Sequence, residues 1–162
     1  MIDLAITVLP AAPLYVLDIW SNPLAVLDRF EKAFGPSLPP LGSSLQLPDR
    51  LLIRYEPTVW LVEGETTGLA EILGSDGSLT AIGGSLVRVR LSGTSWRSLL
   101  MEGGVFDAES KAFAAGCSAT TVIEHVNIRL LVESDNACLA YVPLSYARDM
   151  IHFWTLAAGS LV

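Results

Sequence analysis

The sequence repeats one order of predicted secondary-structure elements in its two halves. The stretch "LYVLDIWSNPLAVLDRF", from Leu14 to Phe30, is typical of a strand followed by a helix, and so is "LVRVRLSGTSWRSLLME", from Leu86 to Glu102. A second pair, "TVWLVEGETTGLAEIL" and "ACLAYVPLSYARDMIHFW", again places a helix after a strand. This similarity lies in the order of elements rather than in the residues, and it indicates a fold built from two similar halves.

With one further strand in each half, both halves are predicted to run strand, helix, strand, strand, helix. A chain of 162 residues is long enough to bury a substantial core and short for two independent domains. We therefore predict a single α+β domain over residues 1–162. It would consist of two ferredoxin-like halves, at about 14–74 and 85–158, with a mainly antiparallel sheet covered by helices.

In the first half, a helix is predicted after the strand at Leu14 to Trp20. Asn22 suits the N-cap, Pro23 suits the first helical position, and Gly35 would end the helix. Its residues at helical spacing are Leu24, Leu27, Phe30 and Phe34. The following "PSLPPLGSSLQLPD" is predicted to be a rigid loop, and it precedes strands at Leu51 to Tyr55 and Thr58 to Glu63 and a short helix in "TTGLAEILG".

The second half is predicted to begin with a half-buried strand, because Val87, Val89 and Leu91 alternate with Arg88 and Arg90. A turn from Ser92 to Ser95 and a helix with Trp96, Leu99 and Leu100, ending at Gly103, are predicted next. Two strands are then predicted, one carrying Val122, Val126, Ile128, Leu130 and Val132 and one from Ala137 to Pro143. The last predicted helix is capped by Ser145, and its apolar face consists of Tyr146, Met150, Phe153, Trp154 and Ala157.

The composition favours a large contact surface. Apolar residues make up 51% of the chain and charged residues only 17%, below the roughly 25% that is usual in soluble domains. Such a chain either carries a partner interface or touches a membrane. The longest apolar stretch, Leu4 to Leu17, is shorter than the about 20 residues of a spanning helix, and Pro10 and Pro13 interrupt it. No basic residue precedes Arg29, unlike in a secretory signal, so we expect a cytoplasmic protein.

Charge and cysteine content disfavour several other functions. The net charge of −7 argues against nucleic-acid binding, which relies on Lys and Arg. Cys117 and Cys138 fit no disulfide framework and no metal motif, so we expect ordinary buried thiols. His125 and His152 are not spaced as a metal pair. We therefore predict no catalytic, cofactor-binding or metal-binding residue in this chain.

The turn "LSGTS" lies between a predicted strand and a predicted helix, where many proteins bind phosphate or mount a nucleophile. It contains neither a phosphate loop, nor a dinucleotide-binding turn, nor a nucleophile elbow. We interpret it as a connection, in which Gly93 permits the tight turn and Thr94 or Ser95 caps the helix. The alternative is an anion at the helix N-terminus, for which Arg97 is the nearby cation.

Polar side chains on two predicted strands form a candidate interaction surface. His125, Asn127 and Arg129 share one face of a strand, because side chains two residues apart point the same way. We interpret this face as a solvated or interface-facing edge. The alternative is a site in which these residues and the arginines at positions 88 and 90 bind a ligand carboxylate, which requires the two strands to be neighbours.

The last predicted helix carries His152 on its polar side with Arg148 and Asp149, where we expect exposure or a partner contact. Glu63 and Glu65 share a strand face but have no histidine nearby, so we expect no acid–base chemistry from them. The candidate interface residues are Arg88, Arg90, His125, Asn127, Arg129, Arg148 and His152.

Several motifs in the second half resemble the gamma subunit of heterotetrameric sarcosine oxidase. They are a strand ending in Leu-Ser-Gly, a helix with paired leucines, a "D…F…G" loop, a Thr and His strand, and a Tyr-Val-Pro strand end before a Ser-Tyr-Ala helix start. The similarity covers Leu86 to Trp154, and "EPTVWLVEGE" extends it weakly back to about Arg50. Before Arg50 no motif is recognisable.

The resemblance implies a fold similar to the folate-binding domain of the glycine-cleavage aminomethyltransferases. It also implies a structural, non-catalytic role in a flavoenzyme complex that oxidatively demethylates an N-methyl amino acid. Larger alpha and beta subunits, with or without a small delta subunit, would be the partners and would carry FAD, FMN, NAD and tetrahydrofolate. Two alternatives remain open: a stand-alone folate-binding or aminomethyltransferase-like domain, and a homo-oligomeric binding protein.

Overall fold

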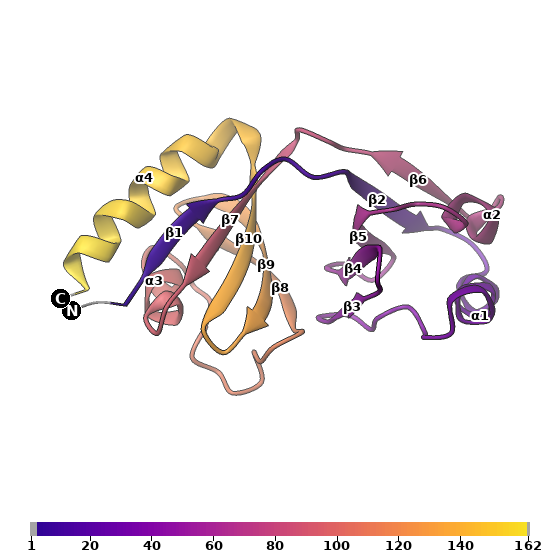
Figure 1. The fold of residues 1–162 in the computed structure, drawn as a ribbon, viewed down its shortest axis with the longest axis horizontal. Coiled ribbons are helices and arrows are strands. Elements are labelled where there is room, and N and C mark those ends of the chain that lie inside the picture. The colour runs from indigo at the N-terminus through magenta and orange to yellow at the C-terminus, as the bar shows by residue number, and fades with distance from the viewer. Residues whose placement is uncertain (1–2, 162) are drawn as a thin grey trace. The chain divides into compact units, whose positions relative to one another are not determined.

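The computed structural model describes residues 3–161, which form two compact units. The first, here called the N-terminal unit, comprises residues 12–83. The second, the C-terminal unit, comprises residues 84–161 together with residues 3–11. Each unit contains two helices and one five-stranded antiparallel sheet, so the α+β class with two similar halves is confirmed (Figure 1).

The N-terminal unit contains a sheet of strand order β3-β4-β5-β2-β6, in which all neighbours are antiparallel. Its elements are β2 (Leu14–Ile19), α1 (Pro23–Phe34), β3 (Ser44–Gln46), β4 (Arg50–Arg54), β5 (Val59–Gly64), α2 (Leu69–Leu73) and β6 (Gly77–Ala81). The strands β3 and β6 were not predicted. The loop expected before β4 therefore contains a short edge strand.

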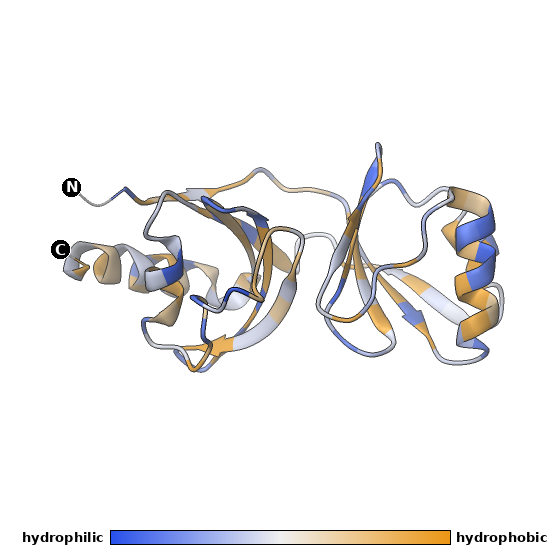
Figure 2. Ribbon diagram, turned by 90° about the horizontal axis from the view of Figure 1, so that it is seen from below, coloured by the Kyte–Doolittle hydropathy of each residue, from blue (hydrophilic) through white to orange (hydrophobic). Residues whose placement is uncertain are grey.

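Helix α1 begins and ends where the sequence predicts, at Pro23 and before Gly35, and three of its four apolar residues at helical spacing pack in the core, Leu24 being the exception. Val26 and Phe30 are fully buried, whereas Leu24 is 80% exposed. Residues four apart lie on one side of a helix, and Val26 and Phe30 define the side that packs on the unit's core. Figure 2 shows hydrophobic and hydrophilic residues alternating around this helix. Leu24, which recurs at helical spacing with Leu27, Phe30 and Phe34, thus lies outside the core.

The C-terminal unit contains a sheet of strand order β1-β7-β10-β9-β8, again antiparallel throughout. Its elements are β1 (Ala5–Val8), β7 (Leu86–Ser92), α3 (Trp96–Met101), β8 (Ser118–Ile123), β9 (Val126–Ser134), β10 (Ala137–Pro143) and α4 (Leu144–Ser160). The single strand predicted around residue 125 is a hairpin of β8 and β9. In Figure 1, α4 lies along this sheet, and it contacts β1, β7 and β10.

The two sheets have equivalent topologies. In each unit the strand before the first helix lies beside the strand before the second helix, and the two intervening strands follow in reverse chain order. In both units the fifth strand pairs antiparallel with the strand that precedes the first helix, β2 in one unit and β7 in the other. In the N-terminal unit this is β6, which follows α2, whereas in the C-terminal unit it is β1, from the start of the chain. The two units therefore share an equivalent fifth strand, although it follows the other elements of the N-terminal unit in the chain and precedes those of the C-terminal unit.

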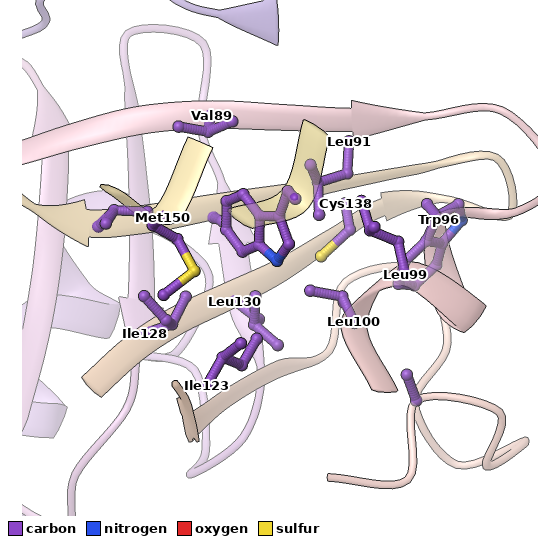
Figure 3. Packing of buried hydrophobic residues seen from close by; sticks show 14 of the residues in the cluster. Val89, Leu91, Trp96, Leu99, Leu100, Ile123, Ile128, Leu130, Cys138 and Met150 are labelled. Atoms are coloured by element: carbon purple, nitrogen blue, oxygen red, sulfur yellow. The ribbon is translucent and has the colours of Figure 1, made fainter. Parts of the chain in front are cut away.

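The core of the C-terminal unit is formed by one sheet face and the two helices (Figure 3). The predicted apolar residues of α3, Trp96, Leu99 and Leu100, are all fully buried. On α4 the predictions are only partly right. Met150, Trp154 and Ala157 are buried, but Tyr146 is 51% exposed and Ser145 lies inside the helix rather than at its N-cap. Among the described residues, no helix has the length and apolarity needed to cross a membrane.

Candidate functional site

The arginines of β7 are engaged in contacts within their own unit. Arg90 forms a bidentate ion pair with Glu133 of β9, with N···O distances of 2.6 and 2.8 Å. Arg88 donates a hydrogen bond from Nη2 to the carbonyl oxygen of Pro10. Since both side chains hold the fold together, a role in binding a ligand carboxylate gains no support from their geometry.

The strands that carry the two groups of candidate residues are not neighbours, because β10 lies between β7 and β9. Arg88 pairs with Tyr141 of β10, and Tyr141 pairs with Arg129 of β9, so the three residues form one row across the sheet. The two arginines in this row are therefore separated by two strand spacings, roughly 10 Å. Asn127 lies exposed on β9, two residues from Arg129. The neighbouring-strand arrangement that the ligand interpretation requires is absent.

His125 lies in the turn between β8 and β9 and not on a strand face, as was predicted. The turn consists of Glu124 and His125, whose φ angles are 46° and 68°. A two-residue hairpin with a type I′ turn needs positive φ at both central residues, which Asn and Gly adopt most readily. The prediction failed because neither residue signals a turn. Glu124 and His125 thus occupy a backbone conformation that L-residues avoid.

Arg148 and His152 are both exposed on α4, as predicted. They lie one helical turn apart and line a shallow hollow of about 470 Å³ with Asp149, Ile151 and Thr155. All five residues come from the same helix, so the hollow is a feature of the α4 surface.

A second pocket lies between the β8–β9 turn and α4; it is called the turn–helix pocket below. Its volume is about 360 Å³. The β8–β9 turn and the start of β9 contribute Glu124, His125 and Val126, and α4 contributes Tyr146, Asp149, Met150 and Phe153. Sequence reasoning identified only His125 and Asp149 as polar surface residues. It missed the pocket because the predicted strand contained no turn that could approach the helix.

Gly103 lies next to two of the residues that line the turn–helix pocket, Glu124 and Phe153. Its φ is 66°, and a methyl group on its Cα would lie 2.7 Å from Glu124 Oε1 and 2.7 Å from Phe153 Cζ. The Glu124 amide donates a hydrogen bond of 3.1 Å to the Gly103 carbonyl. The side chains of Glu124 and Phe153 therefore occupy the space that the Cβ of any other residue at position 103 would need.

The "LSGTS" turn is occupied by the N-terminal segment. The amide of Thr94 donates to Asp3 Oδ2 and that of Ser95 donates to the Asp3 carbonyl, both at 3.3 Å. Gly93 has a φ of 110°, and a Cβ there would lie 2.1 Å from the Asp3 carbonyl oxygen. The side chain of Ser95 makes no capping hydrogen bond. The turn is a packing contact for the start of the chain, and Arg97 stacks on Trp96 with Cζ 4.2 Å from the ring centre.

The cysteines and histidines form no reactive cluster in the described part of the chain. Cys138 is fully buried, and this burial raises the pKa of its thiol far above the usual range. Cys117 is half-buried, and both thiols are free. Residues 3–161 contain no group of three or more His, Cys, Asp or Glu side chains placed to hold a metal ion.

Two solved structures share this fold. A chain of the heterotetrameric sarcosine oxidase from Corynebacterium sp. U-96, in complex with pyrrole 2-carboxylate, matches with a TM-score of 0.83 and 14% identity, over 97% of this chain and 84% of that one. Aminomethyltransferase T of the glycine cleavage system from Bartonella henselae matches with a TM-score of 0.71 and 14% identity, over 97% of this chain and 49% of that one. This chain therefore spans about half of the aminomethyltransferase.

No protein-family profile matches the sequence, and neither does any curated protein sequence. The similarity to these two structures thus lies in the arrangement of the elements and not in overall residue identity. The chain has the fold of the sarcosine oxidase chain and of part of the aminomethyltransferase, as the sequence resemblance implied.

Proposed function

We propose that the protein is a structural, non-catalytic subunit, of the gamma type, in a cytoplasmic flavoenzyme complex similar to sarcosine oxidase. The complex would oxidatively demethylate an N-methyl amino acid. The observation that carries the proposal is the nearly end-to-end match to one chain of a heterotetrameric oxidase, at a TM-score of 0.83. Because 84% of that chain is covered, the match is to a chain of similar size and not to part of a large catalytic subunit.

The surface of the chain supports a role in assembly. Charged residues make up only 17% of the sequence. Large apolar side chains are exposed on α4, among them Leu144 at 59% and Leu156 at 63%. Interfaces of permanent complexes are more hydrophobic than ordinary protein surface. The proposal gives these side chains a partner to cover them.

The partners would be larger alpha and beta subunits, with or without a small delta subunit. These partners would carry FAD, FMN, NAD and tetrahydrofolate, and the oxidation would take place on them. The part assigned to this chain is contact with the large subunits. No step of the reaction is assigned to one of its side chains.

The test is affinity purification of the tagged full chain from its native cells, with absorbance of the eluate recorded from 350 to 500 nm. A yellow eluate containing larger chains in fixed ratio, with oxidase activity on an N-methyl amino acid, is the expected result. An unrelated tagged protein of similar charge serves as the control. A colourless eluate containing only this chain would overturn the proposal.

A stand-alone folate-binding or aminomethyltransferase-like protein is the second candidate function. The match to aminomethyltransferase T over 97% of this chain favours it. It predicts that the purified chain alone binds tetrahydrofolate in a saturable manner. The subunit proposal predicts no such binding by the isolated chain, so equilibrium dialysis with tetrahydrofolate separates the two. A homo-oligomeric binding protein would instead elute alone, at a multiple of 17.4 kDa.

A further inference from the structure

We infer that the turn–helix pocket binds an organic cation, namely an alkylammonium or alkylguanidinium group. This site lies outside the proposed structural role and does not depend on it. Three features of the pocket carry the inference: its charge, its aromatic lining residues and its size.

The charge of the pocket favours a cation. Glu124 and Asp149 bring two carboxylates from different elements to its lining, and none of the seven lining residues is Lys or Arg. Arg148, which precedes Asp149 in the sequence, lines the neighbouring hollow on α4 and not this pocket, and the imidazole of His125 is the one basic group of the lining. Two carboxylates with no Lys or Arg in the lining attract a positive group and repel an anion.

The walls of the pocket suit a cation that carries alkyl groups. Tyr146 and Phe153 are seven residues apart on α4, which places them on the same side of the helix. The face of an aromatic ring attracts an ammonium or guanidinium group within roughly 6 Å of its centre. Met150 and Val126 complete the lining with apolar surface for an alkyl stem. A bare metal ion would gain nothing from these apolar walls.

The size of the pocket suits such a group. At one side the Glu124 amide is hydrogen-bonded to the Gly103 carbonyl, and Glu124 and Phe153 both approach the Gly103 Cα. The volume of about 360 Å³ falls within the roughly 300–1,000 Å³ of small-molecule sites. The pocket therefore accepts a group as large as a guanidinium with its stem.

The experiment is a titration of the ¹⁵N-labelled full chain, followed by amide shifts at constant ionic strength. The cationic probes are tetramethylammonium and Nα-acetyl-arginine amide, and their neutral counterparts are tert-butanol and Nα-acetyl-citrulline amide. We expect at least one cationic probe to shift the amides of Glu124, His125, Val126 and Phe153 in a saturable manner. We expect the neutral counterparts to bind at least about threefold more weakly.

Substitutions locate the site. Glu124→Gln combined with Asp149→Asn is expected to weaken cation binding about three- to tenfold, because it removes both charges. Tyr146→Ala is expected to weaken it about two- to fivefold, while Tyr146→Phe keeps the ring and stays within about twofold of wild type. Glu109→Gln combined with Asp135→Asn, an equal loss of charge at exposed loop positions of the same unit, is the control for the double variant. Unchanged amide shifts elsewhere show that each variant is folded.

Each outcome decides the inference. Binding of both cationic probes supports a small free ammonium compound as the ligand, and binding of the arginine amide alone supports a basic side chain of a partner protein. Equal binding of neutral and cationic probes, or wild-type binding by the double variant, would overturn the inference. So would the absence of saturation by either cation up to about 100 mM, since weaker binding would be non-specific.

Discussion

Asp76 connects the turn before β6 to the start of α1. Its carboxylate accepts hydrogen bonds of 2.8 Å from Ser21, Asn22 and Arg29. The Arg29 guanidinium, followed by Asn22 and Ser21, lowers the pKa of this carboxyl to about 2. Asn22 therefore holds the helix start through Asp76 and not through a cap of its own. The sequence indicated only a turn at Asp76, because its three partners lie more than 45 residues away.

We expect Asp76→Asn to lower the urea midpoint of unfolding, and the loss to depend on pH. The carboxyl has a lower pKa folded than unfolded, so its contribution is present above its ordinary pKa of 3.8 and disappears as the pH falls through about 2. The difference in midpoint between wild type and variant should thus be largest near pH 6 and shrink from pH 5 to pH 2.

The control for this prediction is Asp28→Asn. Asp28 forms an exposed i,i+4 pair with Lys32 on α1, so its removal is expected to change the unfolding free energy by no more than about 0.5 kcal/mol. A deficit of Asp76→Asn that stays constant from pH 6 to pH 2 would contradict the proposed ionic origin.

His125 is a second residue whose backbone departs from ordinary preferences. A non-glycine residue at positive φ is less stable by roughly 1–2 kcal/mol, whereas glycine adopts this conformation freely. Because glycine also loses more chain entropy on folding, we expect His125→Gly to be about 0.5–1 kcal/mol more stable than His125→Ala. Thermal and urea unfolding of the two variants measure this difference. If the alanine variant were the more stable one, the conclusion that residue 125 is strained by its positive φ would be wrong.

At the level of elements, alternating patterns were reliable and edge strands were not. β7 and β10 were predicted within one residue of their bounds, because apolar and polar residues alternate in β7 and an apolar run fills β10. β3 and β6 were missed since they are short edge strands with polar or glycine residues. β1 was missed because its residues are mostly exposed, prolines follow at positions 10 and 13, and the strand depends on pairing with β7.

The different burial of Leu24 and Val26 on α1 leads to a prediction about these two apolar residues. Val26→Ala removes fully buried methyl groups and should destabilise the protein by about 1–3 kcal/mol. Leu24→Ala removes a larger side chain, but that side chain is 80% exposed, so the change should stay within about 0.5 kcal/mol. Urea unfolding of both variants at one pH makes the comparison. A larger loss of unfolding free energy from Leu24→Ala than from Val26→Ala would indicate that Leu24, and not Val26, faces the core.

For the whole molecule, the sequence predicted the two-half architecture and a family resemblance, but not the turn–helix pocket. The architecture follows from the order of elements, which local patterns reveal. The pocket joins Glu124 to Asp149 and Phe153 through a hairpin whose turn carries no Gly or Asn. Such a site depends on tertiary packing, and so the residues that line it were assigned instead to a strand face and to the two sides of a helix.

The candidate interface residues are not equally suited to mutational tests of assembly, because some of them are paired within the chain and others are exposed. Arg90 is paired with Glu133 inside the chain, so its substitution would alter stability as well as assembly. Arg148 is exposed on α4, near Leu144 in sequence, and suits a test of docking. Lys111 is an exposed cation in a loop of the same unit and provides a matched control.

If α4 docks on the large subunits of the proposed complex, Arg148→Glu should reduce the recovery of those subunits about two- to tenfold, because a reversed charge at an interface rim slows association. Lys111→Glu makes the same change in net charge away from α4 and should leave recovery within about twofold of wild type. Quantitative affinity purification from native cells at two salt concentrations measures both variants. The effect of Arg148→Glu should diminish at the higher salt, since exposed charges are screened. Equal recovery of the two variants would exclude the polar face of α4 from the interface and move the search to the apolar side chains at positions 144 and 156.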